Sequence, residues 1–214
     1  MTDSLDNNKE NGTIPRSLPP GGVKIAAAFR QLLHTKNFSD ITVEDIVGVS
    51  GVNSALIYKY FGDKRGLLYY VLSEGLDRFD TGVERELKGI KGALNKLRKL
   101  IWFHINHYKE NRVMARILLL EARSHHSYFQ SEAHQKIRRY NAFLRAIIEE
   151  GIKAGEIRSD IPVWLINQTL MGSVEHLCLP WLISGEEISE DNATEDLCNA
   201  LFSGIETKSF GKNT

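Results

Sequence analysis

The sequence predicts an all-α fold built from two helical domains. The 214 residues include only five prolines, and runs that alternate between apolar and polar residues are few. Apolar residues instead recur every three or four positions over long stretches, as helices with one buried face require. A break in this pattern at residues 88–92 divides the chain. We therefore expect a polar, disordered arm over residues 1–20, a first domain over 21–81 and a second over 82–214.

The first domain is expected to hold three helices that lead into a fourth, beginning with a helix at about 23–36 and ending with one at 63–80. Between them, Thr42 and Asp45 have the spacing of a capping box, which starts a helix. Gly51 follows, and glycine adopts a left-handed turn without strain. Asn53 is a good N-cap for the next helix. The spacing predicts a helix-turn-helix.

The helix after Asn53 has two different faces. Ile57 and Phe61 lie four residues apart and point inward, while the opposite face carries Ser54, Ala55, Tyr58 and Lys59. Serine and alanine allow close approach to base edges, and tyrosine and lysine suit phosphate oxygens. This pattern indicates a helix that lies in the major groove of DNA. From the spacing alone, a hairpin in an ordinary helical bundle, with surface tyrosines, remains the alternative.

Residues 23–70 resemble the DNA-binding domain of the TetR family of bacterial transcriptional regulators. The residues that fit the family pattern are Thr42, Val43, Ile46, Gly51, Val52, Ile57, Tyr58, Tyr60, Phe61, Lys64 and Leu67. Asn53 replaces the usual serine, Ala55-Leu56 replaces glycine-threonine, and Arg65 stands where glutamate is frequent. These departures leave the expected fold unchanged and affect which operator sequence the protein would bind.

The resemblance implies that the protein binds a double-stranded DNA operator. Phosphates would be held by Thr42, Tyr58, Tyr60 and Lys64, and bases would face Ser54, Ala55 and Lys59. Val43 and Asn53 complete the predicted DNA-binding set. The net charge is zero, so the basic footprint expected of a DNA-binding protein must be local.

The second domain is predicted to contain helices at about 93–109, 111–123, 127–154, 162–184 and 190–207. Several of them bring polar residues into apolar faces, as a small-molecule pocket does, although an ordinary core has similar patterns. The candidate pocket residues are Trp102, Phe103, His107, Tyr108, Met114, Leu118, Glu121, Tyr140, Asn141, Phe143, Met171, Glu175 and His176.

The identity of a ligand is implied only by resemblance. The segments MARILLLEARSHHSYF and MGSVEHLCLPWLISG resemble those of regulators of fatty-acid metabolism within the TetR family. This favours an acyl-CoA or a similar long apolar effector, with a drug-like aromatic or other hydrophobic compound as the alternative. The protein is expected to be a repressor that such an effector releases from a palindromic operator.

The last two predicted helices are apolar over more than one face, which indicates a homodimer interface. The family uses its last two long helices in this way. The residues expected there are Trp164, Leu170, Val174, Trp181, Leu197 and Leu201. The alternative is that these residues close the core of the monomer.

Other function classes find no support in the sequence. No catalytic motif is present, so we expect no enzyme, and the scattered histidines and two cysteines predict no metal site and no cofactor. No signal peptide or membrane span is expected, which favours a cytoplasmic, nucleoid-associated bacterial protein. Two alternatives remain: a DNA-binding regulator without an effector, and a helical carrier or enzyme that does not bind DNA.

Overall fold

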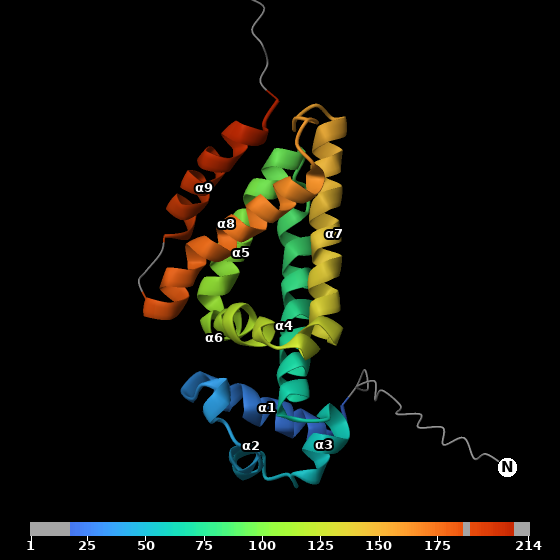
Figure 1. Cartoon of the computed structure of the whole chain (residues 1–214), viewed down its shortest axis with the longest axis vertical. Helices are drawn as coiled ribbons and strands as arrows, with labels where there is room; N and C mark the ends of the chain where they lie inside the picture. The colour runs from blue at the N-terminus through green and yellow to red at the C-terminus, as the bar shows by residue number, and fades with distance from the viewer. Residues whose placement is uncertain (1–17, 186–188, 208–214) are drawn as a thin grey trace, which may run out of the picture. The chain divides into compact units, whose positions relative to one another are not determined.

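The computed structural model describes residues 18–185 and 189–207, and all its named elements are helical, which confirms the predicted all-α fold (Figure 1). Residues 1–17 of the predicted N-terminal arm lie outside the described residues. The elements are α1 (Pro20–Thr35), η1 (Phe38–Asp40), α2 (Val43–Ser50), α3 (Ala55–Phe61), α4 (Lys64–Leu87), α5 (Ala93–Glu110), α6 (Arg112–Arg116), η2 (Ile117–Glu121), η3 (Ala122–Ser124), η4 (His126–Gln130), α7 (Glu132–Lys153), α8 (Val163–Ser184) and α9 (Glu190–Ile205).

The chain forms two compact units, and the boundary lies between Val71 and Leu72. The sequence analysis placed this boundary after residue 81 and found a break in the helical pattern over residues 88–92. In the structure that break is the loop between α4 and α5, both of which contribute to the second unit. The helix α4 runs without interruption through the boundary, so no change in the helical pattern marks it.

The first unit is built as its local sequence predicts. The Thr42 side chain accepts from the Asp45 backbone N–H at 3.0 Å, and the Asp45 carboxylate accepts from the Thr42 N–H at 2.9 Å, which completes the capping box of α2. Gly51 ends α2 with a φ of 66°. Ile46 and Ile57 are fully buried.

The second unit has a core shared by α5, α7, α8 and α9. Two predicted helices are divided in the structure. The segment expected as one helix over 111–123 consists of α6, a π-helical turn (η2) and a 3₁₀ turn (η3). The helix expected from 127 begins instead at Glu132, because Ser131 accepts from the His134 N–H and caps α7 there.

Close packing of the second unit depends on a glycine in α7. A Cβ atom at Gly151 would lie 2.6 Å from the Ala93 Cβ and 2.7 Å from the Ile157 Cδ1. Only glycine therefore lets the start of α5 and the strand-like turn at Ile157 approach this helix. Within the described residues, no helix is both long enough and apolar enough to cross a bilayer.

Candidate DNA-binding face and effector cavity

The helix α3 buries one face and exposes the other, as its sequence predicts. Ile57 and Phe61 are buried, whereas Tyr58 is 55% exposed and lies on the outer side with Ala55 and Lys59. The Asn53 Oδ1 accepts from the Ala55 N–H at 2.8 Å and so caps the first turn. Ser54 and Tyr60 are half-buried at the border of the exposed face.

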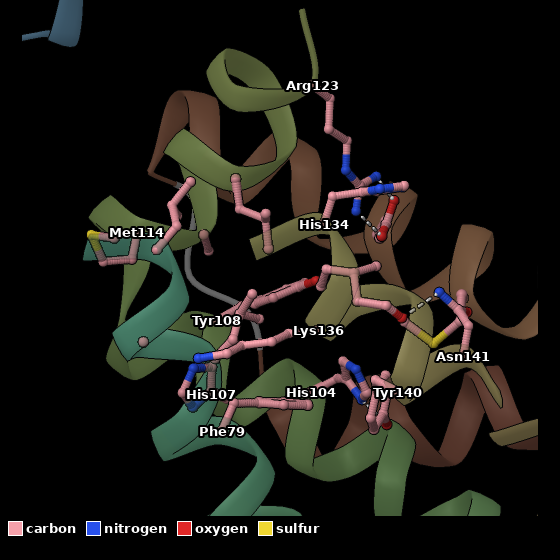
Figure 2. A pocket seen from close by; sticks show the side chains of 18 of the residues that line it. Phe79, His104, His107, Tyr108, Met114, Arg123, His134, Lys136, Tyr140 and Asn141 are labelled. Atoms are coloured by element: carbon pink, nitrogen blue, oxygen red, sulfur yellow. Dashed lines mark hydrogen bonds and ion pairs between the residues drawn. The ribbon is translucent and has the colours of Figure 1, made fainter. Parts of the chain in front are cut away.

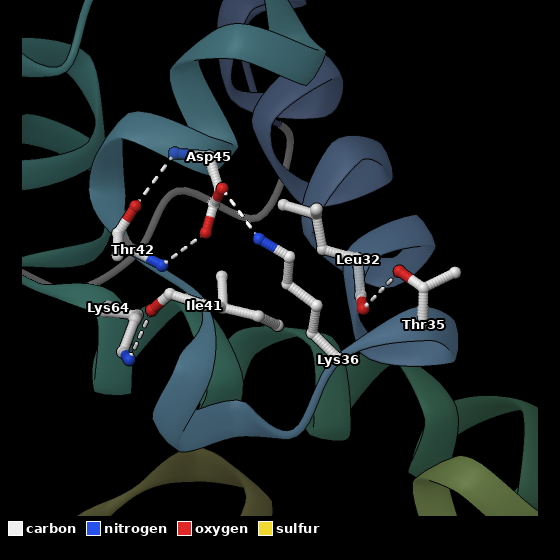
Figure 3. A network of polar contacts seen from close by, with 7 residues as sticks. All are labelled: Leu32, Thr35, Lys36, Ile41, Thr42, Asp45 and Lys64. Atoms are coloured by element: carbon white, nitrogen blue, oxygen red, sulfur yellow. Dashed lines mark hydrogen bonds and ion pairs between the residues drawn. The ribbon is translucent and has the colours of Figure 1, made fainter.

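The N-terminus of α2 is fixed by a polar network that Figure 3 shows. The Lys36 Nζ donates to the Asp45 Oδ1 at 2.8 Å. This hydrogen bond, together with the one from the Thr42 backbone, lowers the pKa of the Asp45 carboxyl. Thr42 is exposed and Val43 half-buried. The predicted contact residues at the start of α2 therefore stand on a turn that the capping box holds in place.

Lys64 has a contact that the sequence did not predict. Its Nζ donates to the carbonyl oxygen of Ile41 at 2.6 Å (Figure 3). It also donates to the carbonyl oxygen of Phe38 at 2.9 Å and lies 4.5 Å from the centre of the Phe38 ring. These bonds tie the start of α4 to the segment before α2. The predicted phosphate contact of Lys64 therefore competes with two hydrogen bonds inside the unit.

A cavity of about 350 Å³ lies within the second unit, bounded by α4 to α8 and the turns η3 and η4 (Figure 2). It brings together eight of the predicted pocket residues: His107, Tyr108, Met114, Leu118, Tyr140, Asn141, Met171 and Glu175. Its volume falls at the lower end of the range of about 300–1,000 Å³ that is usual for small-molecule sites.

Five predicted pocket residues are not among those that line this cavity. Trp102 lies elsewhere, where its Nε1 donates to the Asp191 Oδ1 at 2.7 Å, and Phe103 packs behind Phe79 with ring centres 5.2 Å apart. Phe143 is 41% exposed and borders a separate groove. Glu121 and His176 are also absent from the lining, and His176 is exposed on α8.

Phe79, His104, Arg123 and Lys136 are among the lining residues that the sequence analysis missed. Cationic side chains such as those of Arg123 and Lys136 are usually exposed. Lys136 is in fact 5% exposed, and its Nζ contacts the Ser73 carbonyl at 3.0 Å and the Asp77 carboxylate at 2.5 Å. The available signal was the position of Lys136 on the buried face of α7, with Ala133 and Tyr140.

The cavity wall is rich in aromatic rings. Phe79 packs against His104, His107 and Tyr140 with ring centres about 5 Å apart. His104 is fully enclosed, and its Nδ1 donates to the Leu100 carbonyl at 2.9 Å. Burial lowers the pKa of His104 to about 4, and it also lowers the pKa of His107. Both rings are therefore neutral near pH 7, which keeps this part of the wall uncharged.

Two polar pairs interrupt the apolar wall. The Arg123 guanidinium donates to both oxygens of Glu175, at 2.7 and 2.8 Å. The Asn167 Nδ2 donates to the Asn141 Oδ1 at 3.1 Å, and the buried Asn167 Oδ1 has no hydrogen-bond partner within the described residues. The cavity can thus hold an apolar ligand and still offer hydrogen bonds at defined points.

Half of the predicted interface residues lie in the core of the protomer. Leu170, Val174 and Trp181 are at most 8% exposed and belong to the protomer's own apolar core, so they leave almost no surface for a partner. These three residues therefore fit the alternative, a place in the core of the monomer. Trp164 is 62% exposed, and Leu197 and Leu201 are half-buried.

Comparisons with known proteins agree with this arrangement. Residues 25–71 match the family model described as bacterial regulatory proteins of the tetR family, and residues 72–204 match the model for the C-terminal region of YsiA-like proteins. The two matched segments meet at the boundary between the two compact units.

Among curated proteins, the chain is 24% identical over 189 residues to the fatty acid metabolism regulator protein of Bacillus subtilis, covering 88% of this chain and 97% of that protein. Among solved structures, it is similar to the regulator FadR from Bacillus halodurans, with a TM-score of 0.76, 19% identity and coverage of 90% and 100%. It is also similar to FadR from Bacillus subtilis in complex with stearoyl-CoA, with a TM-score of 0.75, 24% identity and coverage of 86% and 99%.

The two family models together cover most of the described chain, and the helix-turn-helix and its capping residues lie inside the first of them. The chain is a DNA-binding transcriptional regulator and belongs to the TetR family.

Proposed function

We propose that this regulator is a repressor that leaves a palindromic operator when an apolar, acyl-CoA-like effector fills the cavity of the second unit. The observation that carries the proposal is the cavity itself, a space of about 350 Å³ with mainly apolar and aromatic walls. An ordinary core is packed without such voids. The structural relative that binds stearoyl-CoA supports this effector class.

The DNA-binding part of the proposal rests on the exposed face of α3. Tyr58 would contact phosphates, as would Thr42 at the start of α2, whereas Ser54, Ala55 and Lys59 would face bases. A twofold dimer presents two such helices to half-sites about 34 Å apart. Exposed apolar residues of α8 (Trp164, Leu165 and Ile183) support a dimer that uses this helix.

The effector's anionic part would find a cation at the edge of the cavity. Arg78 lines the cavity from α4 and is exposed, and its charge lowers the pKa of the nearby His107. Guanidinium groups bind phosphates through paired hydrogen bonds. An effector with an apolar acyl part and a phosphorylated part fits this combination of wall and edge.

The helix α4 provides a physical route for coupling. Leu72, Leu76 and Phe79 of α4 line the cavity, and the same uninterrupted helix begins at Lys64 in the DNA-binding unit. An effector that moves α4 would change the spacing of the two recognition helices in a dimer. The expected coupling free energy is about 1–3 kcal/mol, which lowers operator affinity by about 5- to 150-fold.

The first experiment is selection of bound DNA from a random pool, followed by gel shift with the enriched site and increasing lauroyl- or stearoyl-CoA. A palindrome that is released by acyl-CoA supports the whole proposal. If a palindrome is enriched but no acyl-CoA releases it, a regulator without this effector class is the better account. Free fatty acid and CoA alone serve as matched controls for the two parts of the effector.

A further inference from the structure

A cluster of polar groups from three separate segments meets within the cavity of the second unit. Arg123 comes from η3, Glu175 from α8 and Tyr108 from α5. Figure 2 places Arg123 and Phe79 on opposite sides of the cavity, with Tyr108 between them. The charges of Arg123 and Glu175 both act on the Tyr108 hydroxyl, whose pKa is raised chiefly by burial. All three residues line the same cavity, and Arg123 is hydrogen-bonded to Glu175.

The cluster has hydrogen-bonding capacity that the described protein groups do not use. A guanidinium carries five N–H donors, and Arg123 places two of them on Glu175. Tyr108 is 6% exposed, and its hydroxyl can donate one hydrogen bond and accept others. Each Glu175 oxygen accepts one bond from Arg123 and can accept another.

This unused capacity disfavours a purely hydrocarbon ligand at this point. An alkyl chain that displaces water from the cluster leaves buried donors and acceptors unpaired, which is costly. A ligand hydroxyl can both accept from Arg123 or Tyr108 and donate to Glu175. A keto oxygen can only accept, and a second carboxylate would lie against the negative charge of Glu175. Sites built to bond a hydroxyl discriminate strongly against the analogue that lacks it.

We infer that Tyr108, Arg123 and Glu175 form a polar subsite that takes a hydroxyl group carried on the acyl part of the effector. This inference rests on the proposed function, because it specifies which acyl-CoA the cavity prefers. The preferred effector is a hydroxyacyl thioester, followed by the ketoacyl and then the saturated thioester of the same length. Such a thioester is the product of hydration of an unsaturated acyl chain or of hydroxylation of a saturated one.

The test is titration calorimetry of the full chain with a matched set of thioesters: lauroyl-CoA, its keto analogue, and hydroxylated analogues with the group near the thioester or at the far end of the chain. A hydroxylated analogue is expected to bind at least tenfold more tightly than lauroyl-CoA. Tyr108→Phe is expected to reduce this ratio to about threefold or less, since it removes one hydrogen-bonding group and keeps the ring.

Tyr140→Phe is the matched comparison. It removes a hydroxyl from the same cavity, but one that lies 3.5 Å from the His104 Nδ1. This variant is expected to keep the preference for the hydroxylated analogue. Because the readout is a ratio of two affinities within one protein, a general loss of stability does not imitate the effect.

The possible results separate this inference from the proposed function. Equal affinities for the saturated and all hydroxylated thioesters overturn the polar subsite and leave an acyl-CoA-responsive repressor intact. A preference that survives Tyr108→Phe unchanged also overturns the assignment. Absence of binding by every thioester contradicts the proposed effector class itself.

Discussion

The two units of this regulator place their functional groups in opposite environments. In the first unit the predicted contact residues stand outward on a short helix, as Tyr58 does with 55% of its surface exposed. In the second unit the important groups are enclosed, such as His104 at 4% exposure and Lys136 at 5%. Residues that act at an exposed surface do not have to fit a packed interior, so local sequence rules decide their structure. Residues that line an enclosed cavity need partners for their charges and hydrogen bonds among the residues packed around them. The two units should therefore respond differently to pH and to mutation.

The largest expected effect concerns pH and the second unit. The pKa of His104 is about 4 in the folded protein and 6.5 when unfolded, so between these values the unfolded state binds the extra proton. The stabilising contribution is fully present above pH 6.5 and is lost as the pH falls toward about 4. The lowered pKa corresponds to a loss of about 3 kcal/mol in the free energy of unfolding.

Urea unfolding across this pH range measures that loss. His104→Leu removes the titrating group, and the curve of stability against pH should become flatter. Some slope should persist, because burial also lowers the pKa of His107. An equally steep curve in the variant would show that other groups cause the acid sensitivity.

The next largest effect concerns a glycine of the first unit. A Cβ atom at Gly66 would overlap the backbone carbonyl oxygen of Phe61, and backbone atoms cannot move aside as a side chain does. Gly66→Ala should lower the free energy of unfolding by about 2 kcal/mol, the overlap outweighing the better helix propensity of alanine. Gly48→Ala in α2 is the control, since a Cβ there meets nothing within 4 Å. If thermal unfolding showed the same change in stability for Gly66→Ala and Gly48→Ala, the packing argument would be contradicted.

A pair of lysine variants tests which cation faces DNA. Lys64→Met loses two hydrogen bonds to backbone carbonyls and should lower stability by about 1–2 kcal/mol. Lys59→Met should leave stability unchanged and reduce by about one the slope of log affinity against log salt concentration. The measurements are urea unfolding and operator binding over a range of salt. If Lys64→Met also reduced the slope of log affinity against log salt concentration, Lys64 would contact a phosphate after all.

The smallest expected effect separates positioning from base recognition. Tyr58→Phe should weaken binding to all DNA sequences by about fivefold, the value of one hydrogen bond to a phosphate. Ser54→Ala should instead change the preference among operator variants. Gel shifts with the selected palindrome and with single-base variants compare the two. The roles would be wrong if both variants changed all affinities by the same factor.

The first unit could be predicted almost completely, because its signals are local. The capping box at Thr42, the turn at Gly51 and the buried pair Ile57 and Phe61 all depend on residues a few positions apart. Lys64 was the exception, since its partners at Phe38 and Ile41 lie more than twenty residues away.

The cavity could be predicted only in part, because it depends on which helices meet. Polar residues within apolar faces, such as Glu175 and Asn141, were found by this signal. Glu121 and His176 satisfied the same signal but are not among the residues that line the cavity. Arg123 was missed because a straight helix was assumed where the chain has a π-turn.

The π-turn at Ile117–Glu121 makes the length of this segment part of what shapes the cavity wall. A π-turn holds one residue more than the α-turn that it replaces, so each later side chain is rotated by about 100° around the helix. Arg123 follows the turn and reaches Glu175 from this rotated position. A relative with the same arginine and glutamate but one residue fewer in this segment would align well and still lack the pair. Among related regulators, an insertion here is therefore a better marker of the polar subsite than the arginine alone.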